Sequence, residues 1–128
     1  MNWSATTYGG KGEYRIYHRS SDFIDPGPSR TFVFLDERED SINDGMFVVD
    51  MLKYPTTTES IVDYPASYHA GSGGFSFVDG HSELKKWRSP QILEKPLKGQ
   101  TRPYPTPLSG APNPDVVWMQ ERASRLVQ

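Results

Sequence analysis

Positions 64–88 read YPASYHAGSGGFSFVDGHSELKKWR, and this stretch decides the fold. Apolar and polar residues alternate from Phe75 to Val78, and Asp79-Gly80 follows where a two-residue turn belongs. Asp-Gly between alternating segments is a strong hairpin signal, because both central residues of a type I′ turn need positive φ. The pattern therefore predicts a β-hairpin with its tip at these two residues.

A two-residue turn also fixes which residues of the hairpin face each other. The predicted pairs are Val78 with His81, Ser76 with Glu83 and Phe75 with Leu84. Because side chains alternate between the two faces of a strand, one face should carry the apolar residues and the other mainly polar ones. The predicted faces are Phe75, Phe77 and Leu84 on one side, and His81, Glu83, Lys85 and Trp87 on the other.

The spacing His69-x9-Asp79-Gly80 resembles the H-X9-DG domain of prepilin-type, type II secretion pseudopilin-like proteins from planctomycete and verrucomicrobial bacteria. Three blocks in order resemble the C-terminal globular part of that family. They are PGPSRTFVFLDEREDSINDGMF (26–47), DYPASYHAGSGGFSFVDGHSELKKW (63–87) and NPDVVWMQERASR (113–125). The resemblance covers most of the chain, and His69, Asp79 and Gly80 are its structural motif residues.

The resemblance implies a pilin-like head that lacks the family's N-terminal helix. Its fold would be α+β and mostly β, an antiparallel sheet with hairpins, a C-terminal helix and a long proline-rich wrap. Its implied role is structural and non-catalytic, through protein–protein contacts in a fibre or secretion-type assembly. The implied partners are other pilin-like or secretion-assembly subunits, in a periplasmic or extracytoplasmic location.

The composition of the chain is consistent with one domain and excludes several classes of partner. Its 128 residues suit a single modest core, and a net charge of −2 gives no electrostatic reason to expect nucleic acid. With no cysteine, it has neither disulfides nor thiolate chemistry. The longest apolar runs are four residues, too short for a signal peptide or a membrane span. We therefore expect either a truncated reading frame or a soluble relative without the anchor.

The pattern along the chain predicts four parts. Residues 1–12 should form a loose lead-in, residues 13–87 the sheet, residues 88–113 an extended proline-rich segment and residues 114–126 a helix. The expected strands of the sheet are Thr31–Leu35, Met46–Met51 and Ser60–Asp63, with a weak candidate at Tyr14–Arg19. The first of these is continuously apolar, which is typical of a central strand covered on both faces.

The C-terminal part of the chain carries a clear helix start. Seven of the eleven prolines lie between Arg88 and Pro114, so that segment should be extended and wrap a surface rather than join a sheet. Asn113-Pro114-Asp115 then combines an N-cap with proline at the first helical position. The apolar residues that follow at helical spacing are Val116, Met119, Ala123 and Val127. We expect this helix to cover the sheet in place of the family's N-terminal helix.

The acidic connection 36–45 is the best metal candidate in the sequence. Calcium takes six to eight oxygen ligands, and Asp36, Glu37, Asp40 and Asp44 could supply several of them. The loop does not match an EF-hand, because Ile42 and Met51 fall at ligand positions. The alternative is a solvated turn whose carboxylates accept bonds from nearby backbone amides.

Two other groups of residues have both a functional and a structural interpretation. His69, Asp79 and His81 could bind a transition metal in a metal-dependent enzyme. Alternatively, His69 forms a hydrogen bond across the glycine-rich bend and Asp79 belongs to the hairpin turn. We favour that structural role and expect no catalytic residues. Tyr64, Tyr68 and Trp87 could stack on sugars in a glycan-binding β-module, although aromatics in small β-domains usually belong to the core. Gly71–Gly74 matches neither a dinucleotide fingerprint nor a P-loop.

Overall fold

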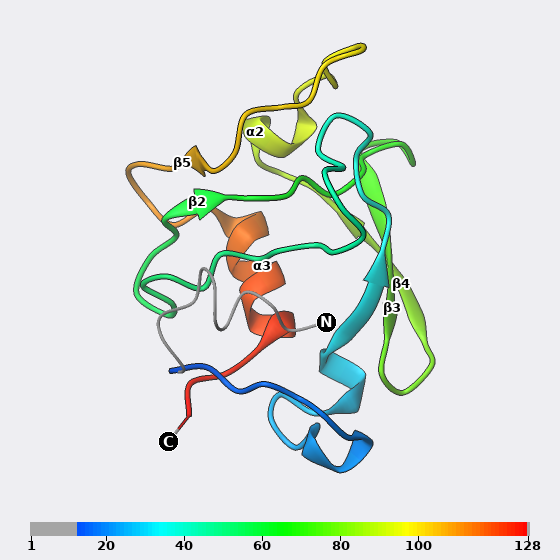
Figure 1. Ribbon diagram of the computed structural model, residues 1–128, viewed down its shortest axis with the longest axis vertical. Helices are drawn as coiled ribbons and strands as arrows, with labels where there is room; N and C mark the ends of the chain where they lie inside the picture. The colour runs from blue at the N-terminus through cyan, green and yellow to red at the C-terminus, as the bar shows by residue number, and fades with distance from the viewer. Residues whose placement is uncertain (1–12, 128) are drawn as a thin grey trace.

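Strand β3 (Ser72–Phe77) is the centre of a three-stranded antiparallel sheet, between β1 (Phe32–Leu35) and β4 (Ser82–Lys86). The structure, a computed structural model, describes residues 13–127 (Figure 1). The predicted lead-in 1–12 lies outside the described residues. The remaining elements are the 3-10 turns η1 (Ser20–Asp22) and η2 (Pro28–Arg30), strands β2 (Ser60–Ile61) and β5 (Thr106–Pro107), and helices α2 (Pro90–Leu93) and α3 (Pro114–Ala123).

The predicted hairpin forms, but its register differs by one residue from the predicted one. Phe75 lies opposite Glu83 and Ser76 opposite Ser82, so the loop has three residues, Val78 to Gly80. Phe77 N donates to His81 O at 2.9 Å, and Gly80 N donates to Phe77 O at 2.9 Å. Only Gly80 has positive φ in this loop, at 90°. This is the three-residue hairpin in which a glycine follows a tight turn, instead of a type I′ turn.

The change of register reverses one face of strand β4. A slip of one residue moves every side chain of a strand to the opposite face. Trp87 therefore lies on the same side as Phe75, with ring centroids 5.8 Å apart, and it is buried in the core. Leu84, predicted to join Phe75, is exposed on the outer face. The predicted division of the hairpin into an apolar and a polar face was thus wrong for β4.

A tight two-residue turn occurs nine residues before Asp79-Gly80, at Ala70-Gly71. Both residues have positive φ, 51° and 79°, and His69 and Ser72 exchange backbone hydrogen bonds of 3.2 and 3.0 Å. This turn leads into β3, where Gly73 allows a close approach. A Cβ atom there would lie 2.6 Å from Ala66 O, which accepts a hydrogen bond of 2.8 Å from Trp87 Nε1. The His-x9-Asp-Gly spacing thus spans β3 from one turn to the next.

Strand β1 is an edge strand, and the prediction of a covered central strand was wrong. It pairs with β3 alone, and its register shifts at a bulge between Phe32 and Phe34. Phe34 is 74% exposed. The predicted second strand, 46–51, is not a strand in the structure, although Val49 and Met51 are buried in the core. Its apolar residues pack without a backbone ladder.

The proline-rich segment contains more regular structure than predicted. Helix α2 and strand β5 both lie within it, and β5 pairs antiparallel with β2, where Pro107 faces Ser60. Proline is tolerated there because this small ladder has two strands, and the nitrogen of Pro107 can point away from the partner. The prediction that this segment would not join a sheet was therefore wrong, while the predicted strand at 60–63 was confirmed over its first two residues.

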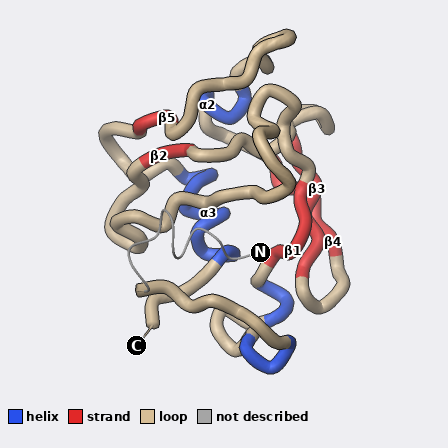
Figure 2. Tube along the Cα trace, viewed as in Figure 1, coloured by secondary structure: helices blue, strands red, loops and turns tan. Residues whose placement is uncertain are grey.

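Helix α3 packs against the sheet as predicted (Figure 2). Asn113 Oδ1 accepts hydrogen bonds from Asp115 N at 3.0 Å and Val116 N at 3.2 Å, which confirms the N-cap. Val116 and Met119 are buried in the core, and Ala123 packs against it. The helix ends at Ala123, before the predicted 126. The chain beyond it is extended, with an isolated antiparallel bridge between Leu126 and Tyr14, the only bridge in the weak strand candidate 14–19.

The predicted fold class is confirmed, because antiparallel sheets and a C-terminal helix form most of the regular structure. Within residues 13–127, no helix is long and apolar enough to cross a membrane.

Candidate binding groove beside strand β1

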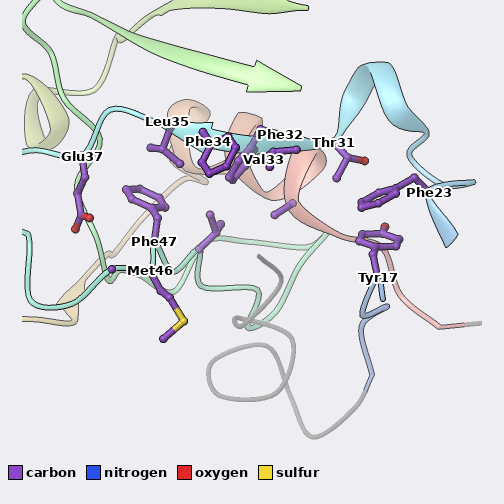
Figure 3. Close-up of a pocket in the computed structure, with 13 residues that line it drawn as sticks. Tyr17, Phe23, Thr31, Phe32, Val33, Phe34, Leu35, Glu37, Met46 and Phe47 are labelled. Carbon is purple, nitrogen blue, oxygen red and sulfur yellow. The ribbon is translucent and has the colours of Figure 1, made fainter. Parts of the chain in front are cut away.

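An apolar groove of about 420 Å³ runs along strand β1 (Figure 3). Strand β1 and the extended segment 46–49 form its long walls, with Phe47 near Leu35. Tyr17 and Phe23 lie together at one end and Glu37 lies at the other (Figure 3). The lining residues are Tyr17, Phe23, Thr31, Phe32, Val33, Phe34, Leu35, Glu37, Gly45, Met46, Phe47, Val49 and Ala123. The volume is in the range typical of ligand pockets.

The groove follows from the edge position of β1. An edge strand has one row of backbone N–H and C=O groups without a neighbouring strand. Among the described residues, the backbone of Phe32–Leu35 forms hydrogen bonds with β3 and with no other segment. The segment 46–49 lies across the groove but does not pair with β1. The groove therefore offers apolar side chains together with unpaired backbone groups.

Glu37 lines the acidic end of the groove, and the buried carboxyl group of Asp63 lies close to it but outside the lining. Glu37 lies in an antiparallel bridge opposite Pro65, held by bonds from Arg38 N to Tyr64 O at 3.0 Å and from Ala66 N to Asp36 O at 2.7 Å. Asp63 comes two residues before Pro65 and is 3% exposed. Its Oδ2 atom accepts a hydrogen bond of 2.6 Å from Val48 N, which ties it to the opposite wall of the groove.

Burial shifts the pKa values of both carboxyl groups upward. Burial first and the charge of Asp63 second raise the pKa of Glu37 to about 7. Burial first, and also the charge of Asp44, raise the pKa of Asp63 to about 6, against the hydrogen bond from Val48 N. Each carboxylate is therefore harder to ionise than an exposed one, because desolvation and a like charge both disfavour the charged form.

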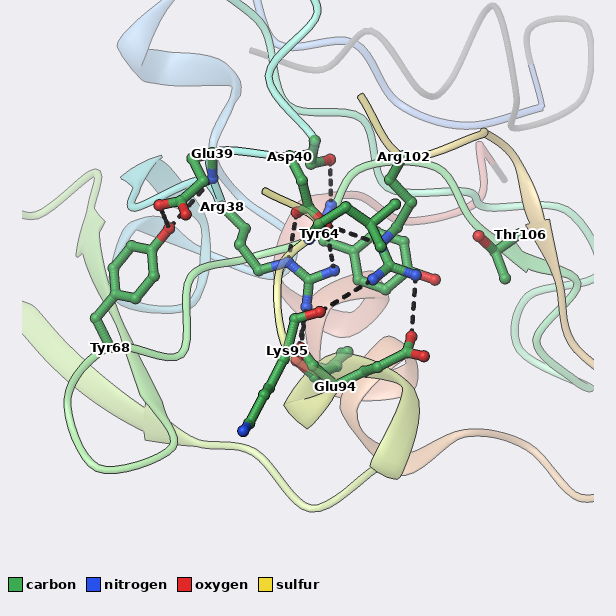
Figure 4. Close-up of polar contacts among 12 residues, drawn as sticks. Arg38, Glu39, Asp40, Tyr64, Tyr68, Glu94, Lys95, Arg102 and Thr106 are labelled. Carbon is green, nitrogen blue, oxygen red and sulfur yellow. Dashed lines mark hydrogen bonds and ion pairs between the residues drawn. The ribbon is translucent and has the colours of Figure 1, made fainter. Parts of the chain in front are cut away.

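A second polar cluster, around Arg38 and Asp40, is structural (Figure 4). Arg38 Nε lies 2.7 Å from Asp40 Oδ1, and both side chains are fully buried. Arg38 Nη1 also donates to Ile92 O at 3.2 Å and to Glu94 O at 2.8 Å. Arg102 Nε donates to Asp40 Oδ2 at 3.1 Å, and both guanidinium groups lie over the ring of Tyr64. The cluster fastens the proline-rich segment to the acidic loop.

The four carboxylates proposed for calcium do not form one group. Asp40 is occupied by two arginines. Asp36 Oδ2 lies 3.9 Å from His69 Nε2, and Asp44 Oδ1 accepts a hydrogen bond from Met46 N at 2.7 Å. The charges of Asp63 and Asp44 both act on Glu37. Within residues 13–127, no three His, Cys, Asp or Glu side chains are grouped so that they could hold a metal ion. Calcium binding by this loop stays a prediction.

The proposed trio of His69, Asp79 and His81 is also divided. His81 Nδ1 lies 2.5 Å from Asp79 Oδ1, and His81 Nε2 lies 3.0 Å from Glu83 Oε1. The hydrogen bond to Asp79 first, and that to Glu83 second, raise the pKa of His81. His69 faces Asp36 at the other end of strand β3. The structure thus places Asp79 and His81 together at the hairpin loop and His69 at the preceding turn.

The aromatics proposed for sugar stacking do not form a surface. Tyr64 and Trp87 are each 2% exposed and belong to the core, as aromatics in small β-domains usually do, so the alternative that these two face a ligand is wrong. Tyr68 is exposed, but its hydroxyl donates to Glu39 Oε2 at 2.7 Å.

Sequence reasoning missed most of the groove. Tyr17, Phe23 and Phe47 are scattered in the sequence, and no spacing links them to β1. Asp63 could have been noticed as an acid inside an apolar segment, Ile61 to Tyr64. Of the described residues that line the groove, the sequence analysis named only Glu37 as a candidate site residue, and it named Glu37 as a calcium ligand.

Comparison with models of known protein families, with curated proteins and with solved structures found no match for this chain.

Proposed function

We propose that this chain is the non-catalytic head of a pseudopilin-like protein and acts through protein–protein contacts at the β1 groove. The observation that carries the proposal is the apolar groove along an unpaired strand edge, with Phe34 exposed at 74%. Contiguous apolar surface beside free backbone groups is a feature of protein-binding sites. The three sequence blocks that resemble pseudopilin-like proteins support the class of assembly.

The groove suits an extended segment of another protein. A segment laid along β1 could pair with its free backbone groups and place alternate side chains between β1 and residues 46–49. The exposed strand edge would then be covered, and the apolar lining would be removed from water. This mode of binding gives affinity through the backbone and specificity through the side chains in the groove.

The lining of the groove favours binding over catalysis. Its hydroxyl groups are those of Tyr17 and Thr31, whose Oγ1 donates to Gly27 O at 2.8 Å. Among the lining residues that the structure describes, no histidine or lysine is present to activate either hydroxyl as a nucleophile. Glu37 supplies the only carboxyl group in that part of the lining.

Substitution at the groove tests this function in the cells that produce the protein. Phe34→Asp should abolish incorporation of the protein into pilin-like or secretion assemblies, because it places a charge in the apolar contact. Leu84→Asp is the matched control, since Leu84 is 68% exposed and lies on β4, at the opposite edge of the same sheet. Equal incorporation of both variants, with unchanged melting temperatures, would contradict the proposal.

A further inference from the structure

We propose that the segment bound in the β1 groove carries a lysine or arginine whose charged group binds between Glu37 and Asp63. This inference rests on the function proposed above and specifies the chemistry of the partner: an extended apolar segment with one basic side chain at the acidic end of the groove.

Two buried oxygen atoms without partners carry the inference. Oε1 of Glu37 and Oδ1 of Asp63 are both buried and accept no hydrogen bond. Asp63 is 3% exposed, and its other oxygen accepts a hydrogen bond from Val48 N. A buried acceptor left without a donor is costly, and more so when it belongs to a carboxylate. These two oxygen atoms therefore lack a donor, and a charged donor would satisfy them best.

The backbone brings the two carboxyl groups close together. Glu37 lies opposite Pro65 in an isolated antiparallel bridge, and Asp63 lies in the bend two residues before Pro65. The charge of Asp63 acts on Glu37 across this short distance. A single ammonium or guanidinium group can bind both carboxylates across such a gap.

The nearby cations of the chain are already occupied. None of the ion pairs in the described part of the chain includes Glu37 or Asp63. Arg38 and Arg102 both bind Asp40. Lys53 lies 2.7 Å from Glu59. Within residues 13–127, no cation thus pairs with these two carboxyl groups, and we assign that role to the occupant of the groove.

An organic cation fits the site better than a metal ion does. Calcium requires six to eight oxygen ligands, and two carboxylates alone supply too few. Across residues 13–127 there is no group of three side chains that could hold a metal. The continuity of Glu37 with the apolar lining also favours a ligand with an apolar body. A basic side chain within an apolar segment has this combination of properties.

Two small probes test the inference on the full chain: 4-phenylbutylamine and its neutral analogue 4-phenyl-1-butanol. Each is titrated into labelled protein, and amide shifts of residues 32–35 and 46–49 are followed by NMR. We expect both to bind in the groove, with the amine about tenfold tighter, as for a hydrogen bond between charged groups. Glu37→Gln should remove that preference for the amine.

The controls separate failure of this inference from failure of the proposed function. Glu59→Gln removes a charge outside the groove and should preserve the preference for the amine, while Asp63→Asn should reduce it. Equal affinity of amine and alcohol for the wild-type protein would contradict the inference that the bound segment carries a basic side chain. The apolar groove would still stand as a docking site. Absence of shifts with both probes would contradict the claim that the groove binds an apolar ligand, and therefore both proposals.

Discussion

The rings of Phe77 and His81 lie nearly parallel, with centroids 4.4 Å apart and an angle of 9° between their planes. This contact exists because the two residues face each other across a three-residue loop. A two-residue loop would have placed Val78 opposite His81 and turned Trp87 out of the core. The length of one loop thus decides which residues of β4 are buried.

Gly80→Val should lower the free energy of unfolding by roughly 1–3 kcal/mol. Gly80 has a φ of 90°, and a β-branched side chain is strained there even though nothing lies within 4 Å of its Cβ position. Gly80→Asn is the matched variant, because asparagine tolerates positive φ better. Urea denaturation of both compares them, and equal loss from the two variants would point to a cause other than backbone strain.

The features of the fold that could be predicted are those encoded by neighbouring residues. Asn113-Pro114-Asp115 predicts a helix start because Asn113 caps the helix itself, and Asp79-Gly80 predicts a hairpin. The register of that hairpin could not be decided, because Asp-Gly suits loops of both two and three residues. The apolar run at β1 was misread, because a strand that lines an open apolar groove and a covered central strand carry the same kinds of side chain.

Asp40→Asn should destabilise the protein by about 3–5 kcal/mol, because it leaves the buried guanidinium of Arg38 without a counter-charge. Although burial alone would raise it, the hydrogen bonds from Arg38, Leu97 N and Arg102 hold the pKa of Asp40 below its usual value. Glu94→Gln alters the exposed partner of Arg102 and should cost less than about 1 kcal/mol. Similar denaturation midpoints for the two variants would show that the cluster does not hold the proline-rich segment.

Met119→Asp should destabilise the domain by about 3 kcal/mol or more, because it places an unpaired charge in the core beneath α3. Met119→Leu conserves the apolar volume and should cost less than about 1.5 kcal/mol. Thermal unfolding followed by circular dichroism measures both variants. An aspartate variant that melts like the parent would mean that α3 is an appendage and does not cover the sheet.

The stability of the protein should fall as pH rises towards 8, in part because of Glu37. Its pKa rises from 4.5 to about 7 on folding, so the native state holds this proton more tightly than the unfolded chain does. Glu37→Gln should therefore melt higher than the parent at pH 8, and the difference should shrink towards pH 5. Glu59→Gln, at an exposed carboxylate, is the control. A constant difference between Glu37→Gln and the parent over this range would contradict the shifted pKa.

The candidate site was less predictable than the fold, because it is assembled from distant parts of the chain. Glu37 was noticed as one acid in an acidic loop, but its neighbour Asp63 lies 26 positions later in the sequence. The loop was expected to be solvated or to bind calcium, whereas Arg38 and Asp40 fold inward beneath Tyr64. Sequence spacing gives no sign of such contacts, because tertiary packing alone brings these residues together.

Photo-crosslinking from position 34 tests the groove as a protein-binding site most directly. p-Benzoylphenylalanine replaces Phe34 in one variant and Leu84 in another, and both proteins are irradiated in the cells that produce them. The account predicts a crosslink to a pilin-like or secretion-assembly subunit from position 34, within the apolar groove, and none from position 84. Crosslinks of equal yield from both positions, or no crosslink from position 34, would contradict it.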